Sequence, residues 1–129
     1  MLKRTLVGIV RSQETTGEKA KDPALKTRYY KLPGELVWNE VVTLIKRTPG
    51  YKLLHEVKNV GEIVLEKKTM LGRTQDITLT IIAVNPVITA IDIYSASRGS
   101  RGDLGSNYRA IRDLYNMFDK KLAQYVIRT

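Results

Sequence analysis

Residues 61–81, GEIVLEKKTMLGRTQDITLTI, contain two alternating segments joined by a short glycine-containing connection. In the first segment, Ile63 and Leu65 fall on one face, whereas Glu62 and Glu66 fall on the other. The second segment repeats the same period of two, with isoleucine and leucine opposite threonine. Such a period is typical of a β-strand with one buried face. The stretch therefore predicts an antiparallel hairpin.

Two more strand candidates flank this hairpin, whose own strands are assigned to residues 60–70 and 74–84. Residues 51–57 precede it and residues 87–95 follow it, with short connections throughout. Short connections between consecutive strands predict a four-stranded antiparallel meander. Because strand 87–95 is apolar on both faces, something should also cover the outer face of the sheet. The N-terminal arm, a second copy in a homodimer or an apolar ligand would each do so.

Two amphipathic helices enclose the meander in the sequence. Residues 32–35 give the start signal of the first helix, and residues 48–50 give its stop signal. The second helix is expected over residues 106–125, with an apolar seam at intervals of three and four. Both helices must bury one stripe, so we expect a two-layer α+β fold with both on one face of the sheet. A coiled coil through the second helix is the minor alternative.

The length of 129 residues fits one domain. We divide the chain into a basic N-terminal strand and irregular arm, residues 1–31, and a single α+β domain, residues 32–129. The possible extra strand lies at residues 5–11. No segment reaches the ~20 apolar residues of a membrane span. The first residues also lack a signal-peptide core, so we expect a cytoplasmic protein.

The chain is strongly basic, with 22 Lys and Arg against 13 Asp and Glu and a net charge of +9. Such a balance favours anionic partners, although a lysine-rich solvent-exposed surface gives the same count. There is no cysteine and one histidine, His55, so common zinc sites and cysteine nucleophiles are excluded. A Ser-His-Asp triad would have to use His55, and no dinucleotide or Walker motif is present. We therefore expect no metal and no cofactor.

The segment that leads into the second helix, residues 95–111 (SASRGSRGDLGSNYRAI), is the candidate site. Its glycines permit close approach, and the first amides of the following helix attract negative charge. These features predict an anion site, whose ligand-binding residues are Arg98, Arg101, Asp103, Asn107 and Arg109. The alternative is a structural brace in which Arg98 pairs with Asp103 and Asn107 bonds the turn.

The same segment resembles the signature of the domain of unknown function 1499 family, found in bacteria and plants. The residues that fall on its positions are Ser95, Ala96, Ser97, Arg98, Asp103, Leu104, Gly105 and Asn107. Upstream, Thr69 and Asp76 resemble the threonine and paired acids of the family, while Gln75 replaces one acid. The resemblance spans residues 36–122. The family has no established activity, so the resemblance implies the domain and the importance of the loop, but no reaction.

The sequence thus favours a small non-catalytic domain that binds an anionic small molecule or protein partner at the arginine and glycine loop. Whether the chain is an enzyme stays open. The alternative is a hydrolase that uses Ser97, Asp103 and Arg98 of the same loop together with Asp92, but no general base is evident. Nucleic-acid binding through the basic arm is a third hypothesis, possible but not favoured.

Overall fold

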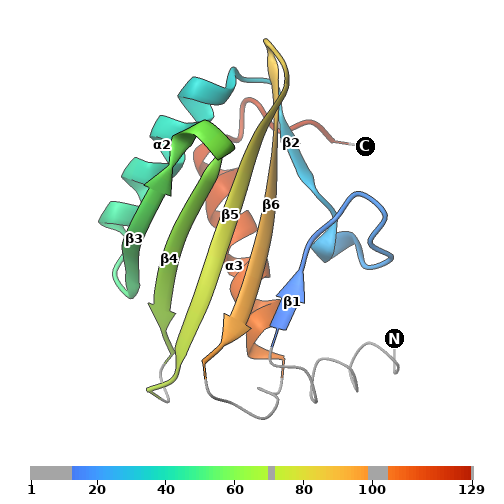
Figure 1. Cartoon of the computed structure of the whole chain (residues 1–129). Helices are drawn as coiled ribbons and strands as arrows, with labels where there is room; N and C mark the ends of the chain where they lie inside the picture. The colour runs from blue at the N-terminus through green and yellow to red at the C-terminus, as the bar shows by residue number, and fades with distance from the viewer. Residues whose placement is uncertain (1–12, 70–71, 99–104, 129) are drawn as a thin grey trace.

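The computed structural model describes residues 13–69, 72–98 and 105–128. Two α-helices, α2 (Gly34–Arg47) and α3 (Ser106–Lys121), pack on one face of a six-stranded antiparallel sheet (Figure 1). The strands are β1 (Gln13–Thr15), β2 (Arg28–Tyr30), β3 (Tyr51–Val57), β4 (Glu62–Lys68), β5 (Thr74–Asn85) and β6 (Ile88–Ser97). Two short 3-10 helices, η1 (Pro23–Leu25) and η2 (Lys58–Val60), lie in connections. The predicted two-layer α+β class is confirmed.

The sheet order is β1-β6-β5-β4-β3, and β2 also pairs with β6. The strands β3 to β6 form the predicted meander, with ends within a few residues of those expected. The register pairs Leu65 with Ile77 and Leu79 with Ile93, so these side chains share the inner face. All four are buried and join both helices in one hydrophobic cluster. The alternation seen in the sequence therefore specifies the core.

Helix α2 begins after its N-cap residue Pro33, and it ends at Arg47 before Thr48. Val37, Val41 and Ile45 form its buried stripe. One acid in the first turn and two bases in the last turn complement the helix dipole. The helix thus matches its sequence signals closely.

Helix α3 begins after Gly105, which has a φ of 81°, and its regular part ends at Lys121 rather than at residue 125. The apolar seam continues through Leu122, which is buried. However, Val126 forms an antiparallel bridge with Tyr30 of β2, so the chain leaves the helix to pair with the sheet. The predicted helix was therefore four residues too long.

The segment that the sequence suggested to be irregular contains β1 and β2, both of which pair with the same edge of β6. Between them, the hydroxyls of Thr16 and Thr27 both donate to Asp92 Oδ1 at 2.7 Å. The arm therefore extends the sheet instead of crossing its face. The strand expected at residues 5–11 lies outside the described residues.

The outer face of the sheet keeps exposed apolar side chains near the β5–β6 turn. Ile82, Val84 and Val87 are each about half exposed. The expected covering of this face by a second chain stays a prediction. Among the described residues, neither helix combines the length and apolar composition that crossing a bilayer requires.

Candidate functional site

The described residues of the predicted site, Arg98, Asn107 and Arg109, lie at one end of the molecule, where the start of β5, the end of β6 and the start of α3 meet (Figure 1). The backbone amide of Arg98 donates to the carbonyl of Thr74 at 2.9 Å. This bond holds the end of β6 against the beginning of β5. The side chains of residues 95–98 are therefore placed by the sheet itself.

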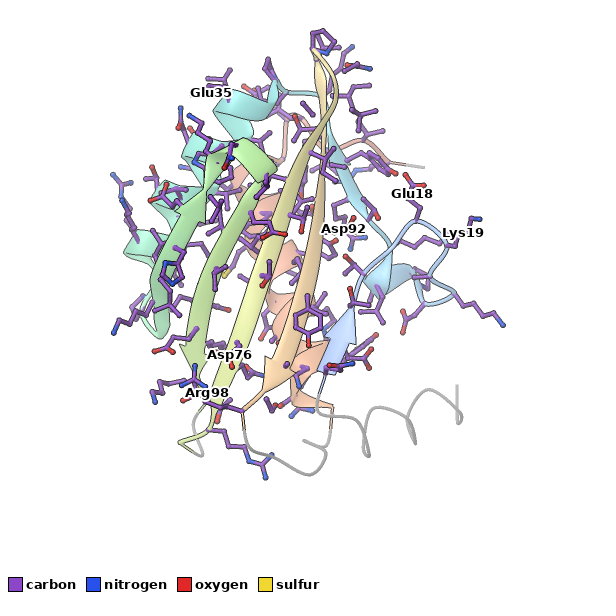
Figure 2. The ribbon with its side chains drawn as sticks, viewed as in Figure 1. Glu18, Lys19, Glu35, Asp76, Asp92 and Arg98 are labelled. Atoms are coloured by element: carbon purple, nitrogen blue, oxygen red, sulfur yellow. The ribbon has the colours of Figure 1, made fainter. Side chains whose placement is uncertain are left out.

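Arg98 is bound to two carboxylates on the outer face of the sheet. Its Nε donates to Asp76 Oδ2 at 3.2 Å, and its Nη2 donates to Asp76 Oδ1 and, at 3.0 Å, to Glu66 Oε2. Figure 2 shows Asp76 and Arg98 together at this end. Glu66 and Asp76 are direct neighbours in the β4–β5 register. Both contacts raise the pKa of Arg98, with the hydrogen bond to Asp76 the largest cause.

A buried polar network lies on the inner face, beneath the start of α3. The side chain of Asn107, which is 1% exposed, is its centre. Its Oδ1 accepts from Ser95 Oγ at 2.7 Å and from Gln75 Nε2 at 3.0 Å, while its Nδ2 donates to Ser97 Oγ at 2.9 Å. Gln75 Nε2 also donates to Ser106 Oγ at 3.2 Å. The network ties the first turn of α3 to β5 and β6.

The network explains why an amide suits position 75. The resemblance noted above implies an acid there, yet Gln75 is almost fully buried and donates to Asn107 Oδ1. An ionised carboxylate has no hydrogen to donate and would be costly to bury beside that oxygen. Glutamine at position 75, where the family pattern has an acid, therefore fits the hydrogen-bond acceptor that it faces.

The predicted site residues occupy different environments. Arg98 is half exposed and paired with acids, Asn107 is buried, and Arg109 is exposed on the first turn of α3. The guanidinium of Arg109 lies 3.6 Å from the position that a Cβ on Gly105 would take. Arg101 and Asp103 lie outside the described residues. Arg98 thus lies on the outer face of the sheet, Asn107 lies on the inner face, and Arg109 is exposed on α3.

The acidic partners of Arg98 were missed by the sequence reasoning, which considered only Asp103 as a partner. The signal was available, because the alternation places Glu66 and Asp76 on the outer face of adjacent strands. Finding it required the register of the β4–β5 hairpin. That register could have been counted from the short turn between the two strands.

The arrangement argues against the nucleophilic chemistry considered for this loop. Ser97 lies on the inner face of β6, whereas Asp92 lies on the outer face and accepts from the threonines of the arm. His55 is on β3, three strand positions from β6, or about 14 Å at the usual strand spacing. The serine hydroxyls instead contact Asn107, whose amide cannot take up a proton as a base. No cluster of three or more metal-ligating His, Cys, Asp or Glu side chains occurs in the described part of the chain.

Comparison with solved structures shows similarity of fold at low identity. The di-domain ARO/CYC StfQ from the steffimycin biosynthetic pathway matches with a TM-score of 0.55 and 13% identity, covering 87% of this chain. The chain spans less than half of StfQ, since the match covers 45% of that protein. A conserved protein from Geobacillus kaustophilus matches with a TM-score of 0.41 and 12% identity, over 76% of this chain and 93% of the other. The Zhui aromatase/cyclase from Streptomyces sp. R1128 has a TM-score of 0.34 and 11% identity, over 87% and 86%.

A comparison with curated proteins gave no match. A family model does match, and it covers residues 9–118, which include both helices almost entirely and the strands β1 to β6. The residues of the Arg98 cluster and of the Asn107 network all fall within this range. The chain therefore belongs to the family described as protein of unknown function (DUF1499).

Proposed function

We propose that the chain is a non-catalytic binding domain that takes an anionic ligand or partner at the loop end of the sheet. Arg98, Arg101, Asp103, Asn107 and Arg109 form the proposed site. The observation that supports it best is the state of Arg98, which is fixed by two carboxylates while its side chain stays 54% exposed. A guanidinium that is already held in place loses little conformational freedom when it binds a further group.

The charges at this end assign different roles to the two described arginines. Asp76 and Glu66 together carry two negative charges against the one positive charge of Arg98, so Arg98 would contribute position and donor geometry and not attraction. Arg109 is exposed at the start of α3, where the helix dipole also favours an anion. We therefore propose that Arg109 contributes most of the affinity, assisted by Arg101 on the segment between them.

Asn107 acts indirectly in this proposal. Its side chain is buried and bound to Ser95, Ser97 and Gln75, so it holds the first turn of α3 against the sheet. It would thereby keep the amides at the start of α3 beside the arginines. A change at Asn107 should weaken binding only as far as it displaces that turn.

The test is calorimetric titration and thermal shift with inorganic pyrophosphate and citrate as probes. We expect saturable binding that Arg109→Ala weakens about tenfold or more, measured at a temperature at which the variant is folded. Arg47→Ala, at the exposed end of α2, is the matched control and should bind as the natural chain does. Absence of saturable binding by both probes, or equal affinity of the Arg109→Ala and natural chains, would overturn the proposal.

A further inference from the structure

A groove lies on a different part of the molecule, between the arm and the residues that follow α3. Its volume is about 680 Å³. Pockets that bind small molecules span about 300 to 1,000 Å³. Asp119, which lines the groove, is 13 residues beyond Ser106, or about 20 Å along α3 from the loop end. The groove is therefore separate from the site proposed above.

The two walls of the groove are fixed to each other by backbone hydrogen bonds. The amide of Ile127 donates to the carbonyl of Tyr29 at 2.9 Å, and the amide of Lys31 donates to the carbonyl of Tyr125 at 2.7 Å. Together with the bridge at Val126, these bonds pair the last residues with β2. The groove is thus bounded by paired backbone, and its shape is preorganised for a ligand.

A cation is held in place within this groove. The guanidinium of Arg28 lies 4.7 Å from the centre of the Tyr115 ring. Its Nε is 3.4 Å from Asp119 Oδ2, and its Nη1 donates to the carbonyl of Pro23 at 3.3 Å. The side chain is 28% exposed, so it can still be reached from solvent. Arg28 resembles the fixed arginines that recognise carboxylates and phosphates.

The acids of the groove are engaged, whereas two of its cations are available. Asp119 pairs with Arg28 and also accepts a hydrogen bond from the phenol of Tyr30 at 2.7 Å. Glu18 accepts a hydrogen bond from the phenol of Tyr29. Lys26 and Arg128 line the same groove, are exposed and form no ion pair with any described residue. Three cations against two engaged acids leave the groove suited to an anion.

We propose that this groove binds a small amphiphilic anion. Its carboxylate or phosphate head would lie among Lys26, Arg28 and Arg128, and its apolar body would lie against Val126 and Ile127. Both apolar side chains line the groove and are partly exposed. An apolar wall with a few charged groups beside it is the usual composition of a small-molecule site.

The test is to titrate the whole chain with small anions and to measure binding by calorimetry and by the chemical shifts of the backbone amides in NMR spectra. Octanoate and phenyl phosphate are the amphiphilic probes, and acetate and inorganic phosphate are the matched head groups. We expect saturable binding of at least one amphiphile, about tenfold or more tighter than its head group, with shifts centred on residues 26–29 and 126–128. The two amphiphiles separate a carboxylate head from a phosphate head.

The variant that tests the charges is the double change Lys26→Ala and Arg128→Ala, because both side chains lie on the surface. We expect it to weaken amphiphile binding about tenfold or more, whereas Lys19→Ala should have no effect. Lys19 extends into solvent from the same arm and does not line the groove (Figure 2). Arg109→Ala should also leave this binding unchanged, which separates the groove from the loop site. Equal affinity of amphiphile and head group, or binding that the double variant does not weaken, would overturn the proposal.

Discussion

Replacing Asn107 with alanine should destabilise the fold strongly, because Asn107 is the centre of a buried network. The change removes the acceptor of the Ser95 hydroxyl and of one Gln75 hydrogen, and it removes the donor to Ser97. Gln75 keeps its bond to Ser106, so it is partly satisfied. Ser95 is fully buried and loses the partner that its hydroxyl has in the structure. The damage should therefore concentrate on the two serines of β6.

The magnitude follows from the number of buried polar groups that lose a partner. Each buried group left without a hydrogen bond costs about 1 to 3 kcal/mol. The lost acceptor of Ser95 alone should lower the free energy of unfolding by about 1 to 3 kcal/mol, and the lost donor to Ser97 adds to this fall. That is a large part of the roughly 5 to 15 kcal/mol that stabilises a typical domain.

The assay is urea unfolding of the natural chain and the variant, followed by circular dichroism and by tyrosine and tryptophan fluorescence. Asn116→Ala is the matched control, since it removes the same side chain from an exposed position of the same helix. The control should change the free energy of unfolding by no more than about 0.5 kcal/mol. A loss below about 1 kcal/mol for Asn107→Ala would refute the view that this network holds α3 to the sheet.

Three further predictions concern the backbone, the outer cluster and pH. Gly61→Ala should lower the free energy of unfolding by about 2 kcal/mol or more, because a Cβ at this positive φ would lie 2.3 Å from a carbonyl oxygen of β5. Gly50 also has a positive φ but lies in open space, so Gly50→Ala should lower it by only about 1 kcal/mol in the same urea assay. Arg98→Ala and Asp76→Asn should each lower the melting temperature, and the double variant should lose less than the sum of the two single losses. This difference from additivity should become smaller in high salt, which screens the ion pair. Strictly additive losses would contradict the observed pairing. Burial and the hydrogen bond to a carboxylate raise the pKa of Tyr30, so the folded chain keeps a proton that the unfolded chain loses. Stability should therefore fall as pH rises above about 10, and Tyr30→Phe should reduce that fall in unfolding curves measured at increasing pH; an unchanged slope would contradict the assignment.

The meander was predictable because each of its strands is long enough to show a period. The strands β4 and β5 carry seven and twelve residues with apolar side chains on one parity, which determines both their presence and their buried face. The strands β1 and β2 have three residues each, too few for a period, and their pairing is set by contacts with β6 that are distant in sequence. The end of α3 was predicted wrongly for a similar reason, because the backbone at Val126 pairs with Tyr30 of β2, which is distant in sequence.

The sequence indicated a segment for the candidate site, which stays a proposal, but it did not indicate the contacts of the residues there. The glycines and arginines of residues 98–109 indicated the loop, and the resemblance indicated the same residues. The partners of Arg98 come from β4 and β5 and required the register of that hairpin. Those of Asn107 come from β5 and β6, and local patterns carry no information about which buried amide meets which hydroxyl. The groove left no sequence signal, because it is formed by segments nearly a hundred residues apart.

The position of the arm has a consequence for self-association. A sheet is prone to open-ended polymerisation when a long flat strand is left at its border. Here one border of β6 is covered by β1 and β2, each only three residues long, and the chain between them is bound to Asp92. The other side of β2 pairs in turn with the backbone around Val126. The opposite border, β3, is interrupted by a bulge between Leu53 and His55. Within the described ranges, neither border therefore offers a long regular template for edge-to-edge pairing of identical copies.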